Sequence, residues 1–187
     1  MADARTSHPV VRAAVAADAA SIVEIYRPAV IDTAISFEEE LPTVEEIQAR
    51  MSARPTMPWL VAEVDGHVAG YAYASPHRQR AAYRWSADCS VYIASAYHRR
   101  GIGRLLYEEL FAQMRTLGYV SMFAGITLPN ESSVGLHERL GFQLVGIYRD
   151  VGFKHGQWLD VGWGKLPLIS PLPVNPVEPL EWHRGGS

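Results

Sequence analysis

The chain has 187 residues, 48% of them hydrophobic, which is enough for one α/β domain with a complete core and too few for two. Its 17 basic and 20 acidic residues leave a formal net charge of −3, so the sequence provides no overall attraction to nucleic acid or to an anionic membrane. A single cysteine excludes an internal disulfide framework, and we find neither a signal peptide nor an apolar run long enough to span a bilayer. We therefore expect a cytoplasmic protein that binds neither nucleic acid nor membrane.

The N-terminal part of the chain predicts one short strand followed by two helices. Residues 10–13 favour the strand, and Asp18 can cap the first helix. Thr43 and Glu46 have the spacing of a capping box, which predicts a second helix that ends near Ser52.

A β-hairpin is the next predicted element. Residues 59–65 and 67–74 are extended apolar runs that flank Asp65 and Gly66, a pair typical of two-residue hairpin turns. After a polar connection that carries arginines, the run that ends at Ile93 predicts a further strand.

The long helix of the chain is predicted from Gly103 to Leu117, with Gly118 at the position of a helix C-cap. Residues 119–127 are apolar enough for a strand that is buried on both faces. The apolar stripe of the helix consists of Ile102, Leu106, Leu110, Met114 and Leu117.

The C-terminal part predicts one more helix and a closing pair of strands. Asn130 can cap the helix, and residues 142–152 and 157–165 have the character of paired strands. Together the elements predict an α/β fold with a mixed sheet covered by helices on both faces, in a single domain over residues 1–168. Prolines punctuate residues 169–187, which predicts a tail that is either surface-bound or disordered.

A basic, glycine-bearing turn over residues 98–104 lies between the strand run Ser90–Ile93 and the long helix. Backbone N–H groups at a helix start have no partners within the helix, and the helix dipole favours an anion there. A dinucleotide fingerprint would need a glycine in place of Leu106, and a P-loop would need a Gly-Lys-Ser/Thr ending. The turn therefore predicts a phosphate site of another kind, although a plain glycine turn with surface arginines would have the same pattern.

This turn resembles the acetyl-CoA motif of the GCN5-related N-acetyltransferases (GNAT), (Q/R)-x-x-G-x-(G/A), with His98 in the place of Gln or Arg. From about Val11 to about Leu168, the chain is similar to the branch of that family that acetylates phosphinothricin and methionine sulfoximine. Five patches carry the similarity, and the last is close to diagnostic: Trp59–Gly66, Ala82–Trp85, Leu128–Asn130, His137–Phe142 and Gly152–Gly162.

The resemblance implies a GNAT fold whose central strands splay apart after Ile93. It also implies an enzyme in which an amine attacks the thioester of acetyl-CoA directly, with no metal, and it implies a homodimer. The amides of the coenzyme's pantetheine arm can bond to a strand edge, and its pyrophosphate can bind the turn. The residues expected to bind acetyl-CoA are Val91, Tyr92, Ile93, Arg99, Arg100, Gly101, Ile102, Gly103, Arg104, Asn130 and Ser133.

The resemblance places two side chains in the catalytic steps. Asp88 stands where the family branch has a glutamate, and it is expected to take the proton from the amine directly or through water. Aspartate is one methylene shorter, and at a strand end it could instead only bond to nearby backbone. His137 is expected to protonate the departing thiolate, since a reference pKa of about 6.5 suits proton transfer near neutrality. A histidine on an apolar helix face can also be a structural group.

Acceptor binding is expected from Phe37, Arg78, Arg80 and Tyr83, together with Asp88. Guanidinium groups hold carboxylate or phosphinate oxygens in a planar, bidentate way, which favours a small amino acid with a second anionic or polar head group. Exposed arginines in a polar loop are the plain alternative.

Three other functions fit parts of the sequence. The acceptor could be a peptide N-terminus or an aminoglycoside, although the arginines disfavour the latter. A module that binds coenzyme A without catalysis would need only the turn. A cysteine hydrolase could use Cys89 with His137, but no activating motif surrounds this cysteine, and a small core residue is the simpler interpretation.

Overall fold

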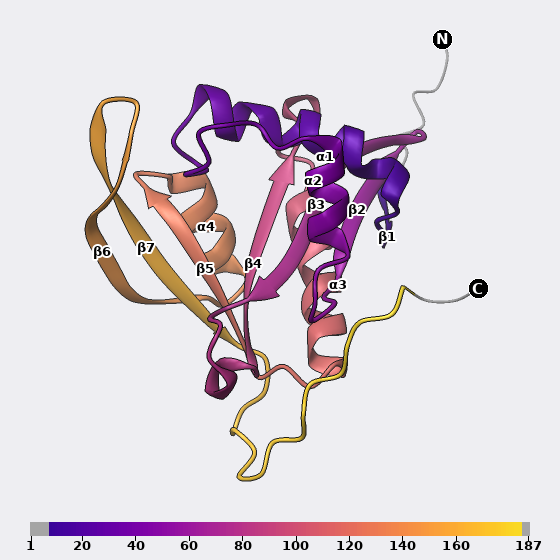
Figure 1. Cartoon of the computed structure of the whole chain (residues 1–187), viewed down its shortest axis with the longest axis vertical. Helices are drawn as coiled ribbons and strands as arrows, with labels where there is room; N and C mark the ends of the chain where they lie inside the picture. Colours follow the sequence, from indigo (N-terminus) through magenta and orange to yellow (C-terminus); the bar gives the residue numbers. More distant parts are fainter. Residues whose placement is uncertain (1–7, 185–187) are drawn as a thin grey trace.

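One mixed β-sheet runs through the computed structural model, which describes residues 8–184 (Figure 1). The strand order is β1-β2-β3-β4-β5-β7-β6, and β4 and β5 are parallel whereas the other neighbours are antiparallel. The strands are β1 (Val10–Ala13), β2 (Trp59–Val64), β3 (His67–Pro76), β4 (Ser86–Ile93), β5 (Ser121–Leu128), β6 (Gln143–Lys154) and β7 (Gln157–Pro167). The helices are α1 (Ala19–Arg27), a π-helical turn (Pro28–Asp32), α2 (Val44–Met51), α3 (Ile102–Thr116) and α4 (Glu131–Arg139).

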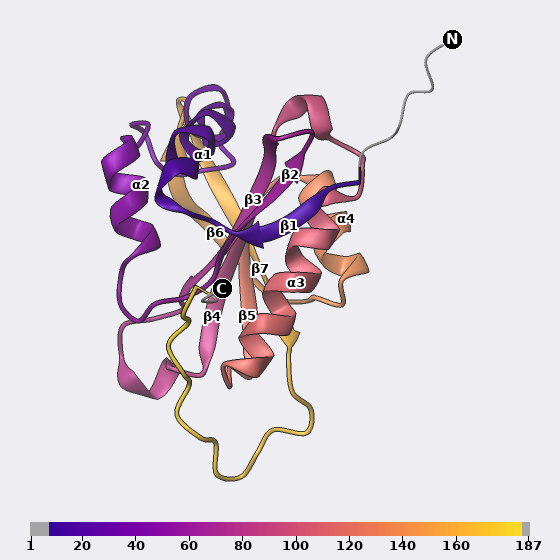
Figure 2. The ribbon, with the colours of Figure 1, turned by 90° about the vertical axis from the view of Figure 1, so that its right-hand side faces the viewer.

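Helices cover both faces of the sheet, as predicted. Figure 2 shows α1 and α2 on one side and α3 and α4 on the other. Side chains alternate along each strand, so the sheet supplies two separate cores. Leu106 and Leu110 of α3 are fully buried in the first core, and Ile22 of α1 and Ile47 of α2 are buried in the second. Within residues 8–184, no helix combines the length and the apolar character that crossing a bilayer requires.

Most of the predicted turns and caps are confirmed. Asp65 and Gly66 join β2 to β3 with φ angles of 52° and 77°, as a two-residue hairpin turn requires. Thr43 and Glu46 form the capping box of α2, and the side chain of Asn130 accepts a hydrogen bond from the N–H of Ser133 at the start of α4.

The predicted cap at Asp18 is wrong. Its carboxylate makes no capping bond to α1. It accepts instead two hydrogen bonds from Arg12 in β1, at 2.7 and 2.9 Å, and one from the N–H of Val15. The guanidinium offers two parallel donors and a full positive charge, whereas a cap offers single backbone N–H groups, which explains why the arginine takes the carboxylate.

The central strands part earlier than expected. β4 and β5 pair at three positions only, from Ser86 opposite Ser121 to Asp88 opposite Phe123, and Figure 1 shows them diverging beyond. The opening therefore begins at Cys89 and not after Ile93. Each strand continues beside its antiparallel neighbour, β3 or β7, and sheet twist rotates the two halves apart.

The segment after β7 follows the surface past the C-terminal end of α3 (Figure 1). The N–H of Leu180 donates to the Leu117 carbonyl at 2.8 Å. Trp182 is buried, and its ring N–H donates to the side chain of Gln113 at 2.8 Å. Leu180 and Trp182 thus anchor this segment to the domain, although it forms no helix or strand and residues 171–178 are exposed.

Candidate active site

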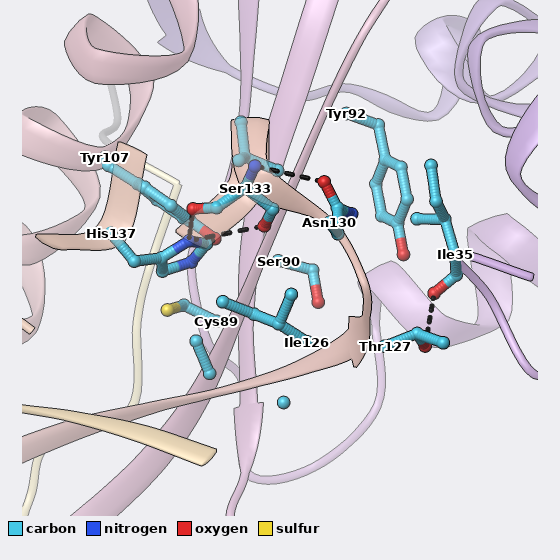
Figure 3. Close-up of a pocket in the computed structure, with 13 residues that line it drawn as sticks. Ile35, Cys89, Ser90, Tyr92, Tyr107, Ile126, Thr127, Asn130, Ser133 and His137 are labelled. Atoms are coloured by element: carbon cyan, nitrogen blue, oxygen red, sulfur yellow. Dashed lines mark hydrogen bonds between the residues drawn. The ribbon is translucent and has the colours of Figure 1, made fainter. Parts of the chain in front are cut away.

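The parting of β4 and β5 creates a cleft, and Figure 3 shows the side chains around it. One wall is β4 from Cys89 to Tyr92, and the other is β5 from Ala124 to Thr127. The remaining lining residues come from α3, α4 and the loop before α2: Tyr107, Asn130, Ser133, His137 and Ile35.

The free edge of β4 faces this cleft. Val91, Tyr92 and Ile93 pair with β3 on one side, whereas on the other side β5 has moved away and pairs with them nowhere in the described chain. The ring of His98 lies with Nε2 2.9 Å from the Ile93 carbonyl oxygen, so that its N–H donates there. An extended arm that carries amides can add to such an edge as a further strand.

The start of α3 has the form of an anion site. Its N-cap is Gly101, at a φ of 77°, and a Cβ at this position would meet nothing within 4 Å. Residues 102–104 follow, and their N–H groups have no carbonyl one turn earlier in the helix. Arg99 and Arg100 are exposed beside the turn, whereas Arg104 is held on its own helix by Glu108 at 2.6 Å. The main chain and two arginines therefore fit a pyrophosphate group.

His137 is buried on α4 with both ring nitrogens engaged (Figure 3). Nδ1 lies 2.7 Å from the Ser133 carbonyl oxygen, and because a carbonyl only accepts, the proton is on Nδ1. Nε2 is then an acceptor for the Tyr107 hydroxyl, 3.2 Å away. Burial lowers the pKa of His137, although the bond to Ser133 opposes this. The ring is thus a neutral group that fixes the Tyr107 hydroxyl at the cleft. Tyr107 was neither among the predicted site residues nor in the predicted apolar stripe of the long helix.

Asp88 lies at the root of the cleft, on the sheet face of α1 and α2. Its neighbours Ala87 and Cys89 belong to the core under α3, so strand alternation directs Asp88 to the opposite face. Its Oδ1 is 2.5 Å from Nδ1 of His77, and burial raises the pKa of Asp88 while this bond opposes the rise. His77 was not among the predicted residues. Its one sequence signal is a place just after β3, which antiparallel pairing brings beside Asp88.

Two of the predicted acceptor residues gather around His77. The Tyr83 ring is 6.0 Å from the His77 ring, and the guanidinium of Arg78 lies over Trp163 at 5.4 Å. Arg80 is exposed in the same connection. Phe37 lies elsewhere, against Gly152 of β6, where an added Cβ would be 2.1 Å from the Phe37 ring.

The loop that carries Phe37 is fixed from beneath by Lys154, at the end of β6. This lysine is buried, and its ammonium donates to the carbonyls of Val30, Ser36 and Glu38 at 2.6, 2.7 and 2.8 Å. The loop therefore has a defined position without secondary structure of its own.

Cys89 does not have the surroundings of a nucleophile. It is buried, its thiol donates to the Phe123 carbonyl at 3.4 Å, and burial raises the pKa of the thiol. The hydrolase alternative is therefore wrong, since the thiolate is the reactive form. Between residues 8 and 184, no three His, Cys, Asp or Glu side chains meet as a metal-binding group.

The sequence model of the acetyltransferase (GNAT) domain matches residues 11–163, most of the chain. The chain belongs to the GNAT family. A phosphinothricin N-acetyltransferase of Streptomyces viridochromogenes is 40% identical over 171 residues, which cover 91% of this chain and 93% of that protein. An L-methionine sulfoximine/L-methionine sulfone acetyltransferase of Salmonella typhimurium is 36% identical over 160 residues, covering 84% and 94%.

A solved structure supports the same family. A GNAT superfamily phosphinothricin acetyltransferase from Sinorhizobium meliloti, in complex with acetyl-CoA, superposes with a TM-score of 0.86 at 40% identity, covering 91% of this chain and 94% of that one. The family, the splayed mixed sheet and the class of enzyme predicted from the sequence are confirmed.

Proposed function

We propose that this GNAT enzyme transfers the acetyl group of acetyl-CoA to the amino group of a small amino acid such as phosphinothricin or methionine sulfoximine. The observation that carries the proposal is the cleft, because its free β4 edge lies between the start of α3 on one face of the sheet and Asp88 with Arg78 and Tyr83 on the other. Two substrates can thus approach from opposite faces and meet between the strands. The relatives named for these two compounds support the choice of acceptor.

Acetyl-CoA would be held by the elements whose geometry fits it. The free edge of Val91–Ile93 suits the pantetheine amides, and the turn with Arg99, Arg100 and the N–H groups of residues 101–104 suits the pyrophosphate. Asn130 and Ser133 complete the cleft at the start of α4. When bound, the thioester supplies an acyl carbon that is open to attack by a neutral amine.

The protein contributes proton transfer and orientation. We place the proton acceptor at Asp88, on the acceptor side. We place the group that supplies a proton to the thiolate at His137 with Tyr107; since Nδ1 of His137 is bound to Ser133, the mobile proton of this pair is the phenolic one. Arg78 and Arg80 would hold the acid groups of the acceptor, and Tyr83 would cover its carbon chain. Phe37 lies apart from these three, against Gly152, and would contact the acceptor from the β6 side.

A homodimer in the cytoplasm is part of the same proposal. The outer strand β6 exposes a row of large apolar side chains, which monomers seldom leave uncovered. With Trp158 of β7, these are Leu144, Val145, Tyr148, Val151 and Phe153, exposed by 48 to 67%. A second copy of the chain would cover them.

A thiol-release assay with acetyl-CoA tests the function, using phosphinothricin, methionine sulfoximine, other amino acids, short peptides and aminoglycosides as acceptors. We expect turnover on the amino acid analogues. Turnover on peptides or aminoglycosides alone would refute the acceptor class, and calorimetric binding of coenzyme A without any turnover would indicate a binding module.

Asp88→Asn tests the assigned base. Because the amide cannot take a proton, we expect kcat to fall by about 10²-fold or more. Asp65→Asn is the matched control, since it makes the same change in the distant β2–β3 turn. Equal kcat in both variants would show that Asp88 has another role.

A further inference from the structure

His77 and Asp88 form an imidazole–carboxylate pair, of which the proposed function uses only the carboxylate. Nδ1 of His77 and Oδ1 of Asp88 are 2.5 Å apart, and their side chains are only 11% and 26% exposed. His77 follows β3 and Asp88 lies on β4, so the pairing of two neighbouring strands fixes both backbones. The contact is therefore built into the sheet.

Aromatic side chains from three segments, β5, β7 and the connection before β4, hold the His77 ring. It stacks on Phe123 of β5 at 4.2 Å and 16°, and it meets Trp163 of β7 edge-on at 5.9 Å and 80°. Tyr83, from the connection before β4, lies 6.0 Å away at 65°. The ring consequently has a fixed orientation at the root of the cleft.

The second nitrogen of the ring is open. An ionised carboxylate only accepts, so the proton that joins the pair is on Nδ1, and in the neutral ring Nε2 then keeps its lone pair. Nε2 has no hydrogen-bond partner in the described chain, where Trp163 Nε1 is the one buried side-chain N or O atom without a partner. Nε2 of His77 is therefore accessible to a ligand or to solvent.

The groups that face the pair would retain an anionic amino acid beside it. Arg78 lies over Trp163 at 5.4 Å, Lys165 of β7 lies over Phe123 at 5.9 Å, and the Tyr83 ring belongs to the same cluster. Among these neighbours, Asp88 is the anion, and it is bound to the imidazole.

We propose that Nε2 of His77 is the atom that takes the proton from the acceptor's ammonium group, and that Asp88 orients the ring. The inference rests on the proposed function and moves its proton acceptor from Asp88 to His77. One oxygen of the short Asp88 side chain is already bound to Nδ1 of His77. The basic atom of the pair is then Nε2, on the side of the imidazole ring away from Asp88. This arrangement follows the logic of a carboxylate that fixes the tautomer of a histidine base.

The proton balance of the step is complete. The ammonium group loses one proton to Nε2, and the resulting imidazolium releases it to solvent. The neutral nitrogen then forms the C–N bond to the acetyl carbon while the C–S bond breaks. The nitrogen's second proton is lost as the amide forms, and the thiolate takes up one proton to become the free thiol.

His77→Asn separates this role from mere support of Asp88. The asparagine amide can donate to Asp88 as Nδ1 does, but it offers no basic atom in place of Nε2. We expect kcat to fall by about 10²-fold or more, with the KM for acetyl-CoA and the thermal midpoint unchanged. His67→Asn, at the exposed start of β3, is the matched control and should retain wild-type kcat.

The outcomes decide between the two proposals. A His77→Asn enzyme with kcat within threefold of wild type would overturn the role of His77 and leave the proposed function intact. No turnover by the wild-type enzyme on any amine would overturn both.

A ¹⁵N spectrum of the wild-type protein gives a readout without catalysis, and it also decides if His77→Asn fails to fold. We expect the neutral ring to carry its proton on Nδ1 and none on Nε2. A neutral ring with its proton on Nε2 would overturn the proposal.

Discussion

Replacing Lys154 by methionine tests how the loop that carries Phe37 is held in place. The lysine ammonium donates to three backbone carbonyls, those of Val30, Ser36 and Glu38, and it is buried beneath the loop that carries Phe37. Methionine has a similar volume and shape, so the variant removes the donors without opening a cavity.

The expected cost follows from these three contacts. Each carbonyl left without a partner costs about 1–3 kcal/mol if water cannot reach it. The bonds to Val30 and Ser36 are buried, whereas the one to Glu38 is partly exposed and can be replaced by water. The loss of the ammonium also removes the cost of burying a charge, which offsets part of the total. We expect a loss of about 3 kcal/mol in the free energy of unfolding and a midpoint lower by about 6–12 °C.

Urea unfolding and steady-state kinetics measure the two consequences. Since Phe37 lies between two of the anchored residues, we also expect a higher KM for the acceptor and an unchanged KM for acetyl-CoA. Lys165→Met is the control for stability, because the Lys165 ammonium contacts only the face of the Phe123 ring among the described interactions. A loss below about 1 kcal/mol for Lys154→Met would refute the view that the three carbonyls depend on this lysine.

Two further predictions concern Phe37 and His137. Gly152→Ala would place a Cβ 2.1 Å from the Phe37 ring and displace it, so this variant should raise the KM for the acceptor several-fold. Gly146→Ala on the same strand is the control, because a Cβ there meets nothing within 4 Å. Equal KM values in the two variants would show that Phe37 does not contact the acceptor. Burial lowers the pKa of His137 below its unfolded value of about 6.5, so the folded state binds fewer protons and its stability falls as the pH drops from 6.5 through the folded pKa. In His137→Phe the free energy of unfolding should decline less over this pH range, as measured by urea unfolding at several pH values. The same decline in the variant and the wild type would refute a lowered pKa for His137.

Features set by neighbouring residues could be predicted from the sequence. The Asp65-Gly66 turn, the Thr43 and Glu46 capping box and the Asn130 cap each depend on backbone within a few residues, and the structure has all of them. The family resemblance, carried by separate patches, likewise gave the fold correctly.

Contacts between distant segments could not be predicted in this way. Asp18 has a local capping pattern, but Arg12 on another element competes for its carboxylate. His77 stands in a polar connection, and its place beside Asp88 depends on strand register, which local patterns do not specify. Lys154 is 116 to 124 residues away from the carbonyls that it binds, so no local rule connects them.

Only three residue pairs join β4 to β5, and these pairs set the separation of the two strands beyond them. That separation depends on how closely the paired residues pack, and among them Ala87 is fully buried opposite Met122. A larger side chain at Ala87 would move β4 and β5 apart without touching anything bound between them. The spacing of two substrates in such an enzyme is thus governed partly by buried residues that neither substrate reaches, and mutations that retune it need not lie in the cleft.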